Sequence, residues 1–447
     1  MRLAWFSPFP PVRTGIAGRS AELVDALTQR GHDVDRYPEP AAHDFVWRRR
    51  LAPYDLVVYQ FGNSSHHDYE WAYALNYPGL VVLHDTHLHH ARAAFLLREK
   101  RTADYRAELR WNHPDISPDV AELAVAGFDS RLYYESPMVR SLIDASRLVA
   151  AHGEGARAEL VSHLSNEGRG SSILDPRSSN VASIRLGEGM PVAPEREGRA
   201  RAAVRATHGI PADAVLFGCF GGLTPEKRIP QILSAFRAVL PHAPGARLLL
   251  AGAAAAHYDI GTAIASGGIA DRVTLAGYLD AEEDLTDHIA ACDVTLNLRW
   301  PTARETSGPW LRALAAGRAT IITDLVHLGD VPSLDPRSWM AQPQPPTPNL
   351  QPPVCVAIDI LDEDHSLRLA MRRLASDAAL REQLGRAARE WWAREHSLEA
   401  MVEDYERVMR DAAGRPDPEI TLPAHMRNPG DRKLRALLEP FGVEVPI

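Results

Sequence analysis

Short apolar segments alternate with amphipathic segments along the first part of the chain, and this alternation constrains the fold more than any other feature. Leu3–Phe6 has the pattern of a short buried strand, and Arg19–Gln29 places its apolar residues on one helical face. Leu56–Gln60, Leu80–Leu83 and Leu148–Ala151 are further predicted strands. Strands that alternate with helices are typical of a parallel sheet covered by helices on both faces.

The same alternation restarts after Gly187, so the sequence predicts a second α/β unit. We expect a doubly wound α/β fold in which two Rossmann-like domains face each other across a cleft, over residues 1–188 and 189–397, with a crossing helix and tail over 398–447. Ligands of open α/β sheets bind at the carboxyl ends of the strands, which places the expected site in that cleft. The predicted strands of the second unit are Val215–Phe220, Arg247–Gly252, Val273–Gly277, Val294–Leu298 and Ala319–Thr323.

Composition excludes several classes of protein. The 447 residues carry 49 Lys and Arg against 58 Asp and Glu, a net charge of −9, so no broad basic field for nucleic acid is expected. No apolar run approaches the ~18 residues that cross a bilayer, the start has no signal-peptide pattern, and the three cysteines are far apart. We therefore expect a cytoplasmic protein. Arg48–Arg50 and a predicted helix over Arg92–Arg110 leave peripheral contact with an anionic membrane face open.

A glycine-rich turn carries the first chemical signal. The predicted strand Val215–Phe220 runs into Gly221 and Gly222, and Lys227 and Arg228 follow just before a predicted helix. Glycine lets the backbone approach a bulky anion, and a helix N-terminus offers N–H groups to it. Two cations beside such a turn suit a diphosphate, although a plain strand-to-helix loop fits the local pattern equally well.

A second polar turn precedes the predicted helix Pro309–Ala316. Thr306 and Ser307 are candidate N-caps for that helix. Glu305 stands where an acid can meet a ligand hydroxyl, or where it complements the dipole at the start of the helix.

Together these two turns resemble the retaining GT-B glycosyltransferases of glycosyltransferase family 4 (glycosyl transferases group 1). Donor domains of that family read Gly-Arg-Leu-x-x-x-Lys-Gly and, later, Glu-x-x-Gly-x-x-x-x-Glu-Ala-Met-Ala-x-Gly. This chain has Gly222 in place of the arginine and Arg312 in place of the second glutamate, with one residue less between the motif positions. Further stretches that resemble the family occur in the same order: Pro10–Ala17, Gly31–Val34, Tyr59–Ser64, Pro78–Asp85 and His396–Leu398.

The resemblance implies three catalytic residues. Lys227 would hold the donor diphosphate and stabilise the leaving phosphate, Glu305 would contact the donor sugar, and His84 would approach that sugar from the first domain. Because Arg312 stands where the family has a ribose-binding glutamate, the nucleotide is not fixed by the motif. Gly222 removes one phosphate cation, for which Arg228, Arg299 or Arg304 could compensate. The donor-binding residues implied by the resemblance are Gly15, Gly221, Gly222, Arg228, Thr306, Ser307, Gly308 and Arg312.

The function implied is transfer of a hexose from a UDP- or GDP-sugar to a glycan, a lipid-linked glycan or a small molecule, with retention of configuration. No cofactor and no metal is required in such a scheme, because Lys227 and helix N-termini can neutralise the diphosphate. Two alternatives stay open: a degenerate GT-B protein that binds a nucleotide sugar or glycan without transfer, and another GT-B enzyme, either an inverting transferase or a sugar-nucleotide epimerase.

A histidine-rich stretch competes with this interpretation. The imidazoles and the carboxylate in His84–His90 are ligands that zinc prefers, but the spacing is not that of a helical zinc motif. We therefore predict no metal site, with His84 at the sugar and the other histidines at the surface. Asp33-Val34-Asp35 and Trp391-Trp392 are interpreted as structural.

Overall fold

The computed structural model describes residues 1–128, 131–166, 179–255, 258–342, 351–419, 422–423, 425–426 and 438–442. By internal packing the chain divides into two units. The first comprises Met1–Ile184, Ala303–Thr306 and Val402–Ile447, and the second comprises Arg185–Thr302 and Ser307–Met401. The first unit therefore ends its first segment at Ile184, whereas the sequence predicted the boundary between the two domains at residue 188. Most of the predicted tail after residue 419 lies outside the described residues.

The first unit is built on a six-stranded parallel sheet in the order β2-β1-β3-β4-β5-β6. The connections run outward in opposite directions from β1 and β3, so the loops after these two strands flank the switch point of the sheet. The strands are β1 (Arg2–Phe6), β2 (Asp33–Tyr37), β3 (Leu56–Phe61), β4 (Leu80–Leu83), β5 (Leu148–His152) and β6 (Val181–Ile184).

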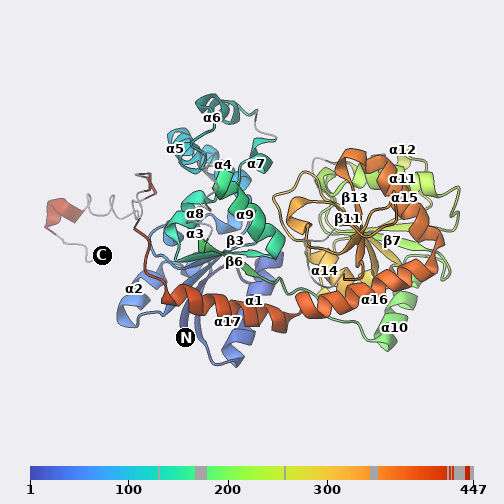
Figure 1. The fold of residues 1–447 in the computed structure, drawn as a ribbon, viewed down its shortest axis with the longest axis horizontal. Helices are drawn as coiled ribbons and strands as arrows, with labels where there is room; N and C mark the ends of the chain where they lie inside the picture. Colours follow the sequence, from blue (N-terminus) through green and yellow to red (C-terminus); the bar gives the residue numbers. More distant parts are fainter. Residues whose placement is uncertain are drawn as a thin grey trace. The chain divides into compact units, whose positions relative to one another are not determined.

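Helices cover this sheet, as Figure 1 shows. The predicted helix over Arg92–Arg110 is in fact two helices, because the chain turns at Lys100, whose φ of +56° ends the first of them. Arg92 is buried and paired with Glu108, so this arginine is not part of a membrane-facing surface. The helices are α1 (Gly15–Gln29), α2 (Asp44–Leu51), α3 (Glu70–Ala74), α4 (His89–Arg98), α5 (Thr102–Asn112), α6 (Pro118–Val125), α7 (Leu132–Glu135), α8 (Arg140–Ala145) and α9 (Glu154–Asn166).

The second unit contains a seven-stranded parallel sheet in the order β12-β13-β11-β10-β7-β8-β9. All five strands predicted for this unit are confirmed to within a residue at each end, and β12 and β13 were not predicted. The strands are β7 (Leu216–Phe220), β8 (Arg247–Ala251), β9 (Val273–Gly277), β10 (Val294–Asn297), β11 (Ala319–Thr323), β12 (Ser333–Leu334) and β13 (Cys355–Ile358). The helices are α10 (Pro194–Thr207), α11 (Ile229–Val239), α12 (Ile260–Ser266), α13 (Glu282–Ala291), α14 (Gly308–Ala315), α15 (Glu363–Ser376), α16 (Ala378–Glu395) and α17 (Leu398–Gly414).

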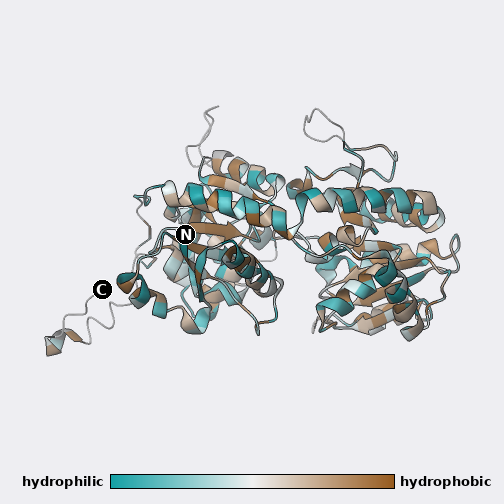
Figure 2. Cartoon of the chain, turned by 90° about the horizontal axis from the view of Figure 1, so that it is seen from below, coloured by the Kyte–Doolittle hydropathy of each residue, from teal (hydrophilic) through white to brown (hydrophobic). Residues whose placement is uncertain are grey.

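Strand β7 shows why the sheet is buried on both faces. Phe217 and Cys219 join the apolar cluster beneath α11, α12 and α15, whereas Leu216 and Phe220 join the cluster beneath α13 and α14. Successive strand residues point to opposite faces, so a continuous apolar run requires cover on both sides. Figure 2 shows hydrophobic strands inside each unit and largely hydrophilic outer helix surfaces.

Helix α17 begins in the second unit and continues in the first from Val402 onward. Its Tyr405 ring packs 5.7 Å from the ring of Trp5 in β1, and the Arg30 guanidinium pairs with its Glu406 at 3.1 Å. The two pairs considered structural behave as expected. Asp35 accepts hydrogen bonds from Arg2 and Tyr54 within the first unit, and Trp391 and Trp392 are both buried.

Within the described part of the chain, no helix combines the length and the apolar character that a membrane span requires.

Candidate functional site

The carboxyl ends of β7 and β10 form the switch point of the second sheet. These strands are neighbours, β8 and β9 lie beyond β7, and β11 lies beyond β10. Both turns singled out in the sequence follow one of these two strands. Because ligands of such sheets bind where the connections diverge, the fold brings both motifs to the edge where a ligand is expected.

Gly221 and Lys227 lie together at this edge. Gly221 has a φ of +96°, and a Cβ built on it would lie 2.6 Å from the Lys227 Nζ atom and 3.8 Å from Pro309 in the first turn of α14. The Lys227 ammonium donates a 2.5 Å hydrogen bond to the Phe220 carbonyl at the end of β7. Gly221 therefore lies where the loop after β7, the Lys227 side chain and the start of α14 meet. A residue with a side chain at this position would have a strained backbone, because its φ is positive.

The neighbouring Gly222 has room beside it, because a Cβ at this position would meet only Thr224 at 3.8 Å. Arg228 has a left-handed φ of +59°, and its guanidinium pairs with Glu363 at the start of α15, with Nε 2.7 Å from Oε1. The structure thus gives Arg228 a carboxylate partner within the unit, and its expected role toward a donor stays a prediction.

Ser307 is confirmed as the N-cap of α14, since its hydroxyl accepts from the Trp310 N–H at 3.4 Å. Gly308 is the first residue of that helix. Arg312, one turn further, pairs with Glu188 at 2.6 Å and with Glu282 at 2.9 Å. Glu188 is almost buried, with 9% of its side chain exposed, whereas 63% of Glu282 is exposed. Arg312 therefore lies between two carboxylates, one of them largely buried.

The loop Ala303–Thr306, which contains Glu305, is packed with the first unit rather than the second. Two contacts hold it there. The His87 N–H donates to the Ala303 carbonyl at 3.2 Å, and the Arg304 Nε atom lies 2.8 Å from Glu159 Oε1. Arg304 has a left-handed φ of +67°, which is unfavourable for a residue with a side chain. These two contacts hold the backbone in that conformation just before Glu305.

His84 follows β4, and its Nε2 atom lies 2.8 Å from Gln60 Oε1. Since an amide oxygen only accepts, Nε2–H donates, and Nδ1 is the acceptor nitrogen. Burial, followed by the neighbouring ring of His152 at 4.6 Å, lowers the pKa of His84 well below its ordinary value. His84 is thus a neutral imidazole, and Tyr405 on α17 donates to the same Gln60 oxygen at 3.1 Å.

Gly15 opens α1, whose N-cap Thr14 accepts from the Ala17 N–H at 3.1 Å. The sequence pattern predicted this helix only from Arg19, and this is wrong because the Thr14 cap starts the helix four residues earlier. A Cβ on Gly15 would have no atom within 4 Å, so open space adjoins the N-terminus of α1.

The histidine-rich stretch does not converge on one point. His84 bonds Gln60, and the buried His89 lies 2.9 Å from the Tyr105 hydroxyl, while His87 is turned toward Glu159 and His163. The prediction that the histidines other than His84 lie at the surface is wrong for His87 and His89, whose side chains are buried, and right for the exposed His90. His84 and His87 lie in the loop between β4 and α4, whereas His89 and His90 open α4.

Sequence reasoning missed four residues that the structure brings to these positions: Gln60, Glu159, His163 and Glu188. Gln60 ends a predicted strand, and polar residues at strand ends are a usable signal. Glu159 and His163 are four residues apart on a helix, which also could have been noticed. Nothing local to Glu188 points to Arg312.

Residues 214–341 match the family model described as Glycosyl transferases group 1. No curated protein sequence matches this chain. Among solved structures, the catalytic domain of starch synthase IV from Arabidopsis thaliana, bound to ADP and acarbose, is similar with a TM-score of 0.62 and 15% identity over 93% of this chain and 99% of that one.

Two bacterial structures are similar over nearly their whole length. A glycosyltransferase from Rickettsia africae has a TM-score of 0.60 and 12% identity, covering 93% of this chain and 99% of that one. The HepE protein of Anabaena, in complex with UDP-glucose, has a TM-score of 0.57 and 13% identity, covering 92% and 99%. The chain therefore has the GT-B fold of glycosyltransferases. Apart from the loop Ala303–Thr306, the segment that matches the glycosyl transferases group 1 model lies within the second unit of this fold.

Proposed function

We propose that this chain is a retaining glycosyltransferase of family 4 that moves a hexose from a UDP- or GDP-sugar to a glycan, a lipid-linked glycan or a small-molecule acceptor. The observation that carries the proposal is the grouping of Gly221, Lys227 and the first turn of α14 at the switch point of the sheet, inside the matched domain. A glycine in a tight turn, a lysine ammonium and helix N–H groups together are suited to a diphosphate.

Lys227 is the residue we assign to the departing diphosphate. Its ammonium rests on the Phe220 carbonyl, and a rotation of its long side chain would carry it to a phosphate oxygen beside Gly221. Ser307 and Gly308 would add N–H groups from the start of α14. The positive charge stabilises the leaving phosphate, which then accepts the proton of the attacking hydroxyl on the same face of the sugar.

We assign sugar contacts to His84 and Glu305. A neutral imidazole with its Nε2–H directed at Gln60 offers Nδ1 as an acceptor for a sugar hydroxyl. Glu305 would accept a second sugar hydroxyl. Neither residue forms a covalent bond to the sugar in this scheme, and no metal takes part in it.

We assign the nucleotide ribose to Glu188. Arg312 occupies the position of the family's ribose-binding glutamate, and it holds the Glu188 carboxylate at 2.6 Å. The test is Glu188→Gln against the matched control Glu282→Gln, since both carboxylates pair with the same Arg312 nitrogen. The first change should weaken nucleotide binding about tenfold or more, as expected for one charged hydrogen bond. The second, at an exposed side chain, should leave binding unchanged.

Peripheral membrane contact, at the cytoplasmic face, is the localisation we propose. Helix α2 exposes Trp47 and Leu51 beside Arg48, Arg49 and Arg50, a combination suited to an anionic lipid surface. Sedimentation with vesicles containing phosphatidylserine should carry down the wild-type chain and leave the Arg49→Glu, Arg50→Glu double variant in the supernatant. Equal sedimentation of both would refute this contact.

The decisive experiment is a donor screen that measures release of nucleoside diphosphate. Lys227→Ala should abolish turnover with the accepted donor, whereas Lys100→Ala, a change to an exposed lysine in the first unit, should not. Tight donor binding without turnover for any acceptor would favour the binding-protein alternative. Inversion at the anomeric carbon of the product, read by NMR, would favour the inverting alternative, and a changed sugar on the recovered donor would favour an epimerase.

A further inference from the structure

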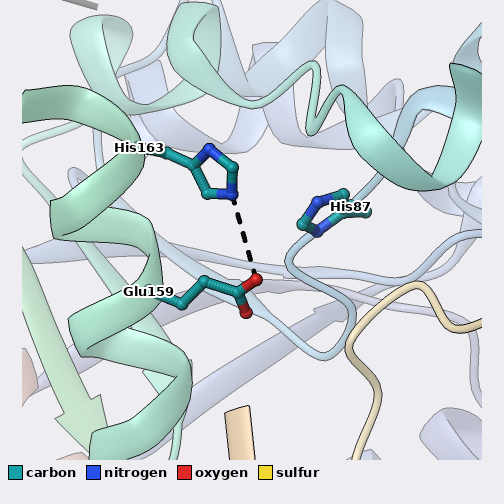
Figure 3. A group of neighbouring side chains, drawn as sticks. All are labelled: His87, Glu159 and His163. Carbon is teal, nitrogen blue, oxygen red and sulfur yellow. Dashed lines mark ion pairs between the residues drawn. The ribbon is translucent and has the colours of Figure 1, made fainter. Parts of the chain in front are cut away.

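Three potential metal ligands meet in the first unit, outside the residues assigned to transfer. They are His87, in the loop after β4, and Glu159 and His163, one helical turn apart on α9 (Figure 3). One nitrogen of each histidine and one oxygen of the carboxylate all lie within 4.8 Å of one another. A Glu159 carboxylate oxygen lies 3.9 Å from His163 Nε2, and the three side chains point toward one another (Figure 3).

The fold explains this meeting. Strands β4 and β5 are parallel neighbours, so the loop after β4 and the helix after β5 begin at the same edge of the sheet. The loop backbone is held by the hydrogen bond from the His87 N–H to the Ala303 carbonyl and by one from the Leu88 N–H to the Pro137 carbonyl at 2.9 Å. These two hydrogen bonds hold the backbone at His87 while its side chain faces Glu159 and His163 on α9.

Two of the three side chains are buried and the third is partly exposed, which leaves a route from solvent to the group. His87 is 1% exposed and Glu159 is 8% exposed, whereas 38% of the His163 side chain is exposed. The two inner ligands are shielded from water, and the outer one lies at the surface. An ion would reach the group past His163.

We propose that His87, Glu159 and His163 bind a divalent cation of the zinc class, which takes the place of the Arg304 guanidinium at Glu159. Two imidazole nitrogens and one carboxylate oxygen are a ligand set that zinc and its transition-metal neighbours favour, and one that Mg²⁺ and Ca²⁺ do not. Zinc bonds of about 2.0–2.2 Å need the ligands closer together than they lie here, and the exposed His163 has the freedom to close that gap.

The Arg304 guanidinium would compete with a metal ion for the Glu159 carboxylate. Its Nε atom lies 2.8 Å from Glu159 Oε1, and a dication and a guanidinium repel each other at one carboxylate. Metal binding therefore releases the ion pair that holds the residue before Glu305. This consequence rests on the function proposed above: a metal that frees the loop Ala303–Thr306 should lower the rate of transfer.

Zinc titration of the full chain after chelator treatment, followed by calorimetry and by the visible spectrum of Co²⁺, tests the site without any donor. We expect one Zn²⁺ per chain and no heat with Mg²⁺. His163→Ala, at a half-exposed position that the fold tolerates, should weaken binding at least tenfold, and His87→Ala should do the same. His90→Ala, an exposed neighbour in the same stretch, should not change the affinity.

Arg304→Ala is the most discriminating variant. It should tighten Zn²⁺ binding because it removes the cation that pairs with Glu159, whereas a purely structural role of Arg304 predicts no change in Zn²⁺ affinity. Unchanged or weaker binding in this variant overturns the replacement of Arg304. Absence of Zn²⁺ binding, or full binding by His163→Ala, overturns the site. Loss of binding in His288→Ala also overturns it, since His288 and His208 form a separate pair in the second unit with Nε2 atoms 3.1 Å apart.

Discussion

Replacing Gly221 with alanine tests the geometry of the phosphate loop more directly than removing its lysine. The glycine has a φ of +96°, which costs a residue with a side chain about 1–3 kcal/mol. The new methyl group would also lie 2.6 Å from the Lys227 Nζ atom. The lysine end is flexible and can move, so the stability loss comes mainly from the backbone, and the displaced ammonium affects binding.

The expected loss of nucleoside diphosphate affinity in Gly221→Ala is separate from the loss of stability. A hydrogen bond to a charged group contributes about 1.5–3 kcal/mol, which corresponds to roughly 10- to 150-fold in the dissociation constant. Gly221→Ala should therefore lower the free energy of unfolding by about 1–3 kcal/mol and weaken nucleoside diphosphate binding at least tenfold.

Gly222→Ala is the matched control. Its Cβ would meet only Thr224 at 3.8 Å and the residue has no left-handed φ, so the change should stay within about 0.5 kcal/mol in stability. Urea unfolding followed by circular dichroism gives the stability difference, and calorimetry with UDP and GDP gives the affinities. Equal binding and equal unfolding midpoints for the two variants would refute the proposed role of this glycine.

Three further predictions concern stability, each measured as the shift in urea unfolding. Arg205→Met should cost about 3–5 kcal/mol, because it removes a buried guanidinium that bonds Asp293 at 2.9 Å and leaves the carbonyls of Ala291 and Ala214 without this donor. Arg201→Met, at a half-buried arginine on the same carboxylate, should cost under about 1 kcal/mol. Burial lowers the pKa of His396 to about 4 from 6.5, so the unfolded chain takes up a proton that the folded chain does not. The contribution of His396 to stability should be full above pH 6.5 and fall by roughly 3 kcal/mol toward pH 4, and His396→Gln should remove that share of the acid loss of stability. Gly385→Ala should cost about 1–3 kcal/mol, because its methyl group would lie 2.2 Å from a backbone oxygen of the adjoining loop; an unchanged midpoint would contradict the packing of α16.

Much of the fold could be predicted because its signals are local. Apolar runs marked the strands from β7 to β11, and a serine before Gly308 marked the start of α14. Both signals are read within one element. Strand β6 was missed because its four residues, Val181–Ile184, are too few to give a clear apolar pattern, and α6, α7 and α8 were missed because such short segments carry no single period.

The sequence by itself determined the α/β alternation, the glycine-rich turn and its lysine, since each depends on residues a few positions apart. Only the tertiary structure decided which carboxylates meet the arginines. Glu363 lies at Arg228, Glu188 at Arg312 and Glu159 at Arg304. These partners are separated by more than a hundred residues, so they come together through strand order, which no local pattern encodes.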